Sequence, residues 1–521
     1  MKRREFLKNS TLTGGAVFGG SLVSETPSGH ANGIKKYDLL LKGGHVIDPA
    51  NNIDTVMDVA VSDKKIACVG MSIPYAAANK VVDLSGFYVT PGLVDIHVHV
   101  FLTFESWVIS VDPDYPSRSS GVTTTVDAGT SGANHFEEFK KIIDNCSKVR
   151  VLAFLNIAAD GMTQVSEDDP SQFNVGKAVE TTNMYSDIII GYKTAHYWKK
   201  SDYEGQTPWK SVEKVIEAGE ETGLPVMYHV NMGQGRTYKE LVTERIRPGD
   251  IITHLFGPGW PSVQNGMVNP DLLIARERGV ICDVGHGGGS FSFLNAVPAF
   301  EQGFLPDSIS SDLWGVNING VVKNLANVMS KFLAMGVSLE EVIRRSTINP
   351  AREINRSDLG SLSEGMTADI AVFRLKDSPA GFNYYDVTGN SIRGNKKLEC
   401  VMTVFGGDVV YDIESLYANA TVGVEEFVKH DFGLISTFPN PFNMSTNITF
   451  VLSNTENIEL CIYNSIGQKV KTLAARTLFP GRHSFVWNGK TDDDISVTSG
   501  VYFAVLRSNS KKDIRRMVLI K

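Results

Sequence analysis

The stretch Pro91-Gly-Leu-Val-Asp-Ile-His-Val-His99 decides the fold, because it is an apolar strand that ends in two histidines. Side chains two residues apart on a β-strand point to the same side, so His97 and His99 are expected to lie together. Further apolar runs follow, separated by amphipathic helical segments. The eight expected strands are residues 93–98, 122–127, 150–156, 188–193, 225–230, 250–254, 280–284 and 308–311. Eight strands that alternate with helices predict an α/β fold, a (β/α)8 TIM barrel over residues 91–346.

Short stretches of alternating apolar and polar residues flank this barrel on both sides. They cover residues 39–47, 57–61, 65–69 and 80–84 before the barrel, and residues 369–373 and 401–409 after it. Alternation with a period of two is typical of β-strands. We therefore predict that residues 32–90 and 347–416 form one small composite β-sandwich, into which the barrel is inserted.

Side chains that can bind a metal follow five of the eight expected strands, at the end where barrels of this class carry their active sites. Imidazoles, a carboxylate and an amine come together there: His97, His99, Lys193, His229, His254 and Asp312. Any one of these histidines alone fits a structural role better. The whole set at successive strand ends favours a site for zinc or another divalent first-row metal.

This set resembles the amidohydrolase superfamily, whose pattern is HxH on strand one, Lys on strand four, one His each on strands five and six, and Asp on strand eight. Nearby segments resemble its amidohydrolase/deacetylase subgroup, which is related to dihydroorotase. They include Gly191-Tyr-Lys193, Tyr228-His229 and Asp283-Val-Gly-His-Gly287. The resemblance covers residues 37–412.

The resemblance implies a binuclear metal site that holds two divalent ions, with zinc as the expected metal. Lys193 would bridge the two ions as a carbamate. One ion would also be bound by His97, His99 and Asp312, and the other by His229 and His254.

The resemblance also implies how the site would work. A hydroxide shared between the metals would attack the scissile carbonyl. Asp312 would be the catalytic base and then the acid, and His286 would bind the substrate carbonyl or carboxylate. Two positions depart from the subgroup, because Ala195 and Trp314 stand where it tends to have a basic residue and a histidine. These departures put the substrate in doubt, not the metal chemistry.

The function predicted first is hydrolysis of an amide or ester bond, N-acyl or O-acyl, in a small carboxylate-bearing molecule. One alternative is hydrolysis of a cyclic amide, as in dihydroorotase or hydantoinase. Another is a secreted surface protein that keeps the barrel without catalysis. The intact set of ligand-type residues argues against this last alternative, and the two hydrolase hypotheses differ in the substrate and not in the metal site.

The N-terminus has the features of an export signal. Lys2-Arg3-Arg4-Glu5-Phe6-Leu7-Lys8 resembles the twin-arginine motif, and a weakly apolar run at 11–23 follows it. The run is too short and too polar for a permanent membrane anchor. We predict a signal peptide over residues 1–31, cleaved between Ser24 and Ala31; the alternative is a basic disordered end.

The C-terminal part changes to short β-type runs separated by turns, which predicts an all-β sandwich over residues 435–521 after a linker at 417–434. Ser499-Gly-Val-Tyr-Phe503 and the basic ending Arg515 to Lys521 resemble the type IX secretion sorting domain. An accessory binding sandwich is the alternative. The expected partners besides substrate are the export and secretion machinery, and the expected location is periplasmic, extracellular or at the cell surface.

Composition excludes other classes of function. The net charge of −8 and the pI of about 5.8 do not provide the basic surface that nucleic acid requires. The five cysteines are scattered without a CxxC pair, which disfavours a disulfide scaffold and a thiolate metal site. A homo-oligomer remains open.

Overall fold

A computed structural model describes residues 36–102, 110–146, 148–162, 167–195, 203–229, 232, 235–422, 432–479, 481–509 and 511–521. The predicted signal peptide and the middle of the predicted linker lie outside the described residues. All of the described residues belong to one of the chain's two units, Lys36–Lys521.

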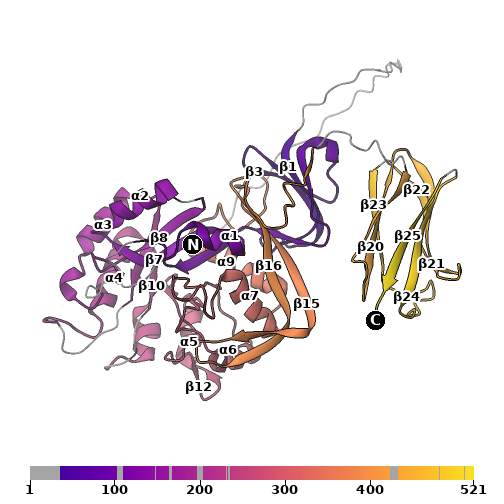
Figure 1. Ribbon diagram of the computed structural model, residues 1–521. Helices are drawn as coiled ribbons and strands as arrows, with labels where there is room; N and C mark the ends of the chain where they lie inside the picture. Colours follow the sequence, from indigo (N-terminus) through magenta and orange to yellow (C-terminus); the bar gives the residue numbers. More distant parts are fainter. Residues whose placement is uncertain are drawn as a thin grey trace, which may run out of the picture. The chain divides into compact units, whose positions relative to one another are not determined.

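Seven parallel strands form the barrel sheet (Figure 1), in chain order from β6 to β14. They are β6 (Leu93–Val98), β7 (Val122–Gly132), β8 (Arg150–Asn156), β9 (Ile189–Thr194), β10 (Val226–Tyr228), β11 (Ile251–Ile252) and β14 (Ile281–Cys282). The expected eighth strand is reduced to two parallel bridges. Ser308 pairs with Asp283 after β14, and Leu313 pairs with Val98 of β6. The eighth segment therefore lies between the last and first strands, as a TIM-barrel-like fold requires.

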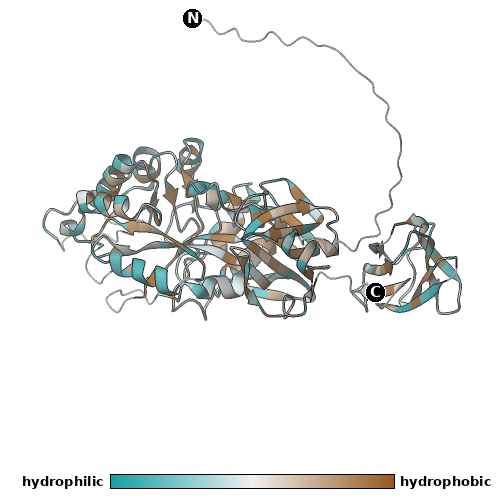
Figure 2. Cartoon of the chain, turned by 90° about the horizontal axis from the view of Figure 1, so that it is seen from above, coloured by the Kyte–Doolittle hydropathy of each residue, from teal (hydrophilic) through white to brown (hydrophobic). Residues whose placement is uncertain are grey.

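Helices follow the barrel strands, and several begin at a side chain that caps the first turn. Asn269, Ser292, Asn324 and Ser338 each accept a hydrogen bond from a first-turn amide, which satisfies a donor that has no helical partner. The helices are α1 (Asp114–Ser120), α2 (Phe136–Cys146), α3 (Val175–Met184), α4 (Lys210–Thr222), α5 (Pro270–Glu277), α6 (Phe293–Glu301), α7 (Leu325–Ala334), α8 (Leu339–Arg344) and α9 (Ile348–Glu353). Short helical turns and a small hairpin add η1 (Tyr75–Ala77), η2 (Pro170–Gln172), η3 (Glu240–Arg245), β12 (Val263–Gln264) and β13 (Met267–Val268). The strands are mainly apolar and the surrounding helices carry hydrophilic residues (Figure 2).

The two flanks of the barrel join in one nine-stranded sheet, because β5 pairs with β15 in antiparallel register from Pro91 opposite Ile370. The sheet contains β1 (Tyr37–Asp48), β2 (Ile53–Ser62), β3 (Lys65–Gly70), β4 (Ala78–Asp83), β5 (Tyr88–Pro91), β15 (Ile370–Tyr385), β16 (Ser391–Phe405), β17 (Asp408–Asp412) and β18 (Thr421–Val422). A composite β-domain is therefore present, although its strands share one hydrogen-bonded sheet. The β15–β16 hairpin is much longer than expected and packs on α7, where Ser330 Oγ accepts from the Leu398 amide.

The C-terminal part is all-β, with a three-stranded and a four-stranded sheet around buried Trp487, Phe450 and Leu460. Its strands are β19 (Phe432–Phe438), β20 (Thr446–Leu452), β21 (Glu456–Asn464), β22 (Lys469–Leu478), β23 (Gly481–Trp487), β24 (Gly500–Arg507) and β25 (Lys512–Leu519). Within the described part of the chain, no helix is long and apolar enough to cross a membrane.

Candidate metal centre

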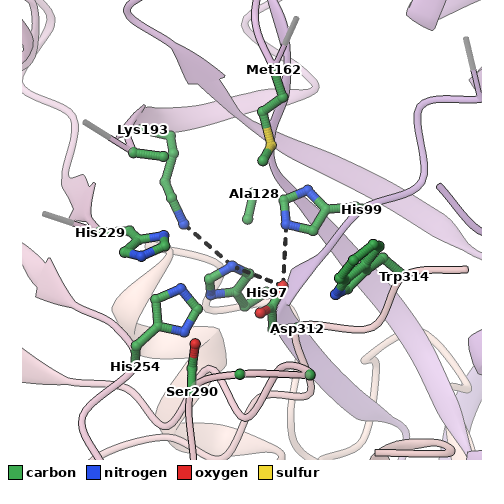
Figure 3. A pocket seen from close by; sticks show the side chains of 13 residues that line it. His97, His99, Ala128, Met162, Lys193, His229, His254, Ser290, Asp312 and Trp314 are labelled. Carbon is green, nitrogen blue, oxygen red and sulfur yellow. Dashed lines mark hydrogen bonds and ion pairs between the residues drawn. The ribbon is translucent and has the colours of Figure 1, made fainter. Parts of the chain in front are cut away.

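One cavity of about 140 Å³ lies at the C-terminal ends of the barrel strands. All six predicted metal ligands line it, and Figure 3 shows their side chains converging. The set is His97, His99, Lys193, His229, His254 and Asp312. The structure thus brings together residues that are spread over more than two hundred positions of sequence.

Asp312 is the centre of the tightest group. Its Oδ1 lies 3.2 Å from Nε2 of His99 and 3.5 Å from Nε2 of His97. The ligand atoms of these three residues all lie within 4.8 Å of one another. Asp312 has a φ of 46°, in the left-handed region that non-glycine residues seldom adopt. Such strain often accompanies a functional position, and here it accompanies a carboxylate beside two imidazoles.

Lys193 lies between the two histidine groups. Its Nζ lies 3.3 Å from Nε2 of His97 and 3.3 Å from the Met227 sulfur, and the side chain is 1% exposed. Burial lowers the pKa of Lys193 to about 8. Desolvation therefore favours the neutral amine, which is the form that can react with carbon dioxide.

His229 and His254 form the second group, with ring centroids 4.1 Å apart, and the His254 ring is 4.9 Å from that of His97. Burial lowers the pKa of His254 to about 4 and takes the pKa values of His97 and His229 well below their ordinary range. Neutral imidazoles keep the lone pair that a metal requires.

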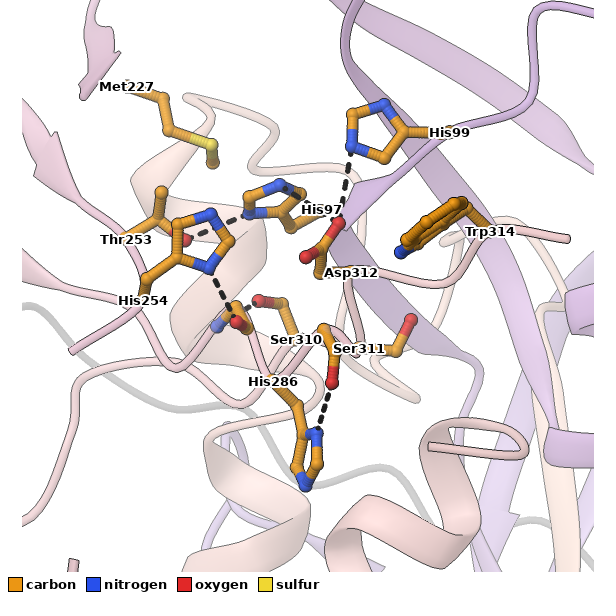
Figure 4. A network of polar contacts seen from close by, with 12 residues as sticks. His97, His99, Met227, Thr253, His254, His286, Ser310, Ser311, Asp312 and Trp314 are labelled. Atoms are coloured by element: carbon orange, nitrogen blue, oxygen red, sulfur yellow. Dashed lines mark hydrogen bonds and ion pairs between the residues drawn. The ribbon is translucent and has the colours of Figure 1, made fainter. Parts of the chain in front are cut away.

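Hydrogen bonds outside the pocket set the tautomers of two of these histidines (Figure 4). Nδ1 of His254 lies 2.7 Å from the carbonyl oxygen of Gly285, which can only accept, so Nδ1 carries the hydrogen. Thr253 donates its hydroxyl to Asp283 at 2.7 Å, which leaves its oxygen to accept from Nδ1 of His97 at 2.8 Å. Both rings therefore present an unprotonated Nε2 to the pocket, as metal ligation requires. The donor set fits a divalent metal.

Thr253 and Asp283 are the supporting residues that the sequence pattern did not single out. Asp283 follows β14 and is fully buried, and Thr253 directly precedes His254. The rule that strand ends carry function points to Asp283, but nothing in the sequence shows that a threonine links it to His97.

Replacement of Thr253 by valine is expected to weaken metal binding about 10- to 100-fold, because His97 loses the acceptor that fixes its tautomer. Metal titration followed by competition with a chelator measures the change. Thr125→Val is the matched control, since Thr125 is also buried in a barrel strand and its hydroxyl has no partner among the described residues. Equal effects of the two substitutions would contradict the role given to Thr253.

Comparisons with known proteins agree with this geometry. A model of the amidohydrolase family matches residues 293–410, and a model of the FlgD Ig-like domain matches residues 441–512. A deacetylase of Brucella anthropi is 35% identical over 367 residues, which cover 68% of this chain and 88% of the relative. The chain belongs to the amidohydrolase family. A deacetylase of Agrobacterium fabrum is 34% identical over 357 residues, covering 67% of this chain and 85% of that protein.

Solved structures extend the comparison of this amidohydrolase to other activities. A crystal structure of a dihydroorotase has 30% sequence identity and a TM-score of 0.62, and a crystal structure of an adenine deaminase has 27% identity and a TM-score of 0.65. Each match covers 72% of this chain and 99% of the solved chain. The matches in sequence and in structure therefore include proteins named deacetylase, dihydroorotase and adenine deaminase.

In this amidohydrolase, His286 does not line the pocket, unlike the expectation that it binds substrate. Its ring is fully buried, points away from the metal ligands (Figure 4) and stacks on Phe291, with centroids 4.5 Å apart. Gly285 and Gly287, on either side, have φ values of 45° and 52°. These two left-handed residues turn the backbone so that the intervening side chain faces the outer layer of the barrel.

The positions that depart from the resembled subgroup do lie at the site. Trp314 and Ala195 line the cavity together with Ala128 and Met162, so part of its lining is apolar. His196, which together with Trp314 is expected from the sequence to alter the shape and charge of the pocket, lies outside the described residues.

Proposed function

We propose that this amidohydrolase hydrolyses an amide or ester bond, N-acyl or O-acyl, of a small carboxylate-bearing substrate. The observation that carries the proposal is the single cavity lined by all six ligand-type side chains, in which His97 and His254 present unprotonated Nε2 atoms. The two deacetylases among its relatives support an acyl bond as the target.

The chain's own residues divide into two overlapping ligand groups. His97, His99, Lys193 and Asp312 would hold one divalent ion, and Lys193, His229 and His254 the other. We propose zinc as the metal and a carbamate on Lys193 as the shared ligand. When bound, the ions would supply an activated water and polarise the scissile carbonyl.

Asp312 would carry the proton of this reaction. The residue is 8% exposed, and its carboxylate faces the cavity beside His99. A carboxylate in this position can accept a proton from the attacking water and return it to the leaving nitrogen or oxygen. Asp312 would thus be a ligand and the general base and acid.

Metal-reconstituted protein tested against a substrate panel checks the proposal. The panel contains N-acyl amino acids of both hands, O-acyl hydroxy acids, cyclic ureides and adenine. We expect bound zinc and hydrolysis of at least one acylated acid. Turnover of cyclic ureides alone would instead favour the dihydroorotase-like alternative, which the matching dihydroorotase structure supports. Metal-loaded protein that hydrolyses none of these compounds would contradict the enzyme proposal.

We also propose that the protein is exported, with the N-terminal residues as a twin-arginine signal and the C-terminal all-β domain as a type IX sorting signal. The sequence motifs support this, and the partners would be the corresponding export and secretion machinery. Fractionation of producing cells into cytoplasm, periplasm, surface and medium tests it, and complete retention in the cytoplasm would contradict it.

A further inference from the structure

A buried lysine pairs with His286 behind the metal pocket. Lys331 lies on α7, is 1% exposed, and donates from Nζ to the carbonyl oxygen of Tyr385 at 2.7 Å. The same Nζ lies 2.7 Å from Nε2 of His286. Nδ1 of His286 lies 2.9 Å from the carbonyl oxygen of Gly287, which can only accept. The hydrogen is therefore on Nδ1, and Nε2 accepts from Lys331.

The tip of the β15–β16 hairpin binds the chain just beyond His286. The amide of Val387 donates to the carbonyl oxygen of Phe291 at 3.2 Å. The carboxylate of Asp386 accepts from the amide of Phe293 at 2.9 Å. We call Lys331, His286 and Asp386 the clamp, because together they fix the loop after β14 to α7 and to the hairpin.

The clamped loop, residues 285–290, faces the metal pocket on its other side. The carbonyl of Gly285 holds His254, and a Cβ added at Gly287 would lie only 2.2 Å from Oδ2 of Asp312. The loop backbone is therefore packed directly against a metal ligand. A side chain at Gly287 would have no room.

Ser290 is the residue of this loop that offers a polar side chain to the pocket. It lines the cavity with Gly288 and Gly289, and in Figure 3 its hydroxyl points toward the space between His254 and Asp312. Among the residues that the structure describes, no partner for this hydroxyl is present. A hydroxyl directed into a pocket with no protein partner is available to a ligand.

The pocket needs such a donor, since its described lining contains one lysine or arginine, and this is the proposed metal ligand Lys193. A carboxylate that enters the cavity must find hydrogen-bond donors there, because an unpaired buried charge is costly. We propose that Ser290 binds the substrate carboxylate and that the clamp positions Ser290 for this contact. The proposal rests on the proposed function. It makes Ser290 a specificity residue and Lys331 a positioning residue.

The test compares an acylated acid that the zinc-loaded enzyme hydrolyses with the carboxamide of the same compound. Ser290→Ala is expected to lower kcat/KM for the carboxylate about tenfold or more, mainly through KM, and for the carboxamide less than about threefold, because only a charged acceptor gains a strong hydrogen bond. Lys331→Met should show the same selective loss. Zinc content and melting temperature are measured on every variant, and Ser346→Ala, which removes a buried hydroxyl without a partner among the described residues, is the matched control.

Each outcome decides one question. Equal losses on the two compounds in Ser290→Ala would overturn the carboxylate contact while leaving the hydrolase intact. A selective loss in Ser290→Ala with a fully folded Lys331→Met that behaves like wild type would overturn the clamp. If Lys331→Met does not fold, the Ser290 comparison still decides the contact. Wild-type enzyme that hydrolyses neither compound nor any other acylated acid would refute the proposed function, and the carboxylate contact with it.

Discussion

Replacement of Lys193 by alanine is expected to remove metal from both halves of the site. It should lower kcat/KM by more than about 10- to 100-fold, which is the loss typical when a residue that only hydrogen-bonds to a metal ligand is replaced. The reason is its central place. Its Nζ is 3.3 Å from His97, and as a carbamate it would be the one ligand that both ions share. Replacement of Lys193 should therefore weaken the binding of both ions, whereas replacement of His229 should weaken the binding of one ion only. Metal analysis together with steady-state kinetics measures both effects.

The carbamate gives this prediction a second readout. The intact mass of wild-type protein reconstituted with zinc in bicarbonate should exceed the mass calculated from its sequence by one carbon dioxide. Lys193→Ala treated in the same way should not show this added mass. A short carboxylate such as formate, which offers two oxygens like a carbamate, should restore part of the metal content in the space that alanine leaves. Lys214→Ala, on the exposed face of α4, is the control. A Lys193→Ala protein that retains both metals would refute the shared ligand.

The position of the site was predictable from the sequence because two regularities act together. Alternation of side chains on a strand puts His97 and His99 on one side, and parallel strands bring their C-terminal ends to one edge. These rules place residues as distant as Lys193 and Asp312 in one cavity, where the structure has them. Both rules describe residues in β-strands, so they predict a side chain's position best where the ligand lies at the end of a strand.

The rules fail in the loop after β14, where no strand fixes the direction of a side chain. His286 stands between two glycines with positive φ, and its side chain faces Lys331 instead of the pocket. The sequence pattern contains no signal for that direction. Ser290, four residues later, lines the cavity, where the resemblance had placed His286.

The β15–β16 hairpin shows a different limit. In its outer half, charged residues, Gly and Pro interrupt apolar residues such as Leu375, Phe382 and Ile392, so hydrophobic alternation predicted strands only near 369–373 and 401–409. Ion pairs between the two strands hold this part of the hairpin together. Nζ of Lys376 lies 2.6 Å from Oε2 of Glu399. The extension matters because its tip carries Tyr385 and Asp386 to the clamp.

Replacement of Asp312 by asparagine is expected to lower kcat about a hundredfold to ten-thousandfold, the range attributed to a general acid or base. Asparagine keeps an oxygen that can bind a metal but cannot take and return a proton. Zinc content should therefore fall much less than activity, in contrast to Lys193→Ala. Measurement of both on the same preparation separates loss of metal from loss of proton transfer.

The leaving group provides the sharpest control on this role. Hydrolysis of an ester whose leaving group departs without a proton, such as a nitrophenolate, should depend less on Asp312 than hydrolysis of an amide does. Such an ester still needs Asp312 to accept a proton from the attacking water, but it does not need the proton to be returned to the leaving group. The ratio of amide to activated-ester turnover should then drop in Asp312→Asn and stay unchanged in Asp144→Asn, which alters an exposed carboxylate on α2. Equal losses on both substrates with full zinc content would mean that Asp312 acts on the attacking water alone. Activity within about threefold of wild type would exclude it as the general base, given the size of the effect expected.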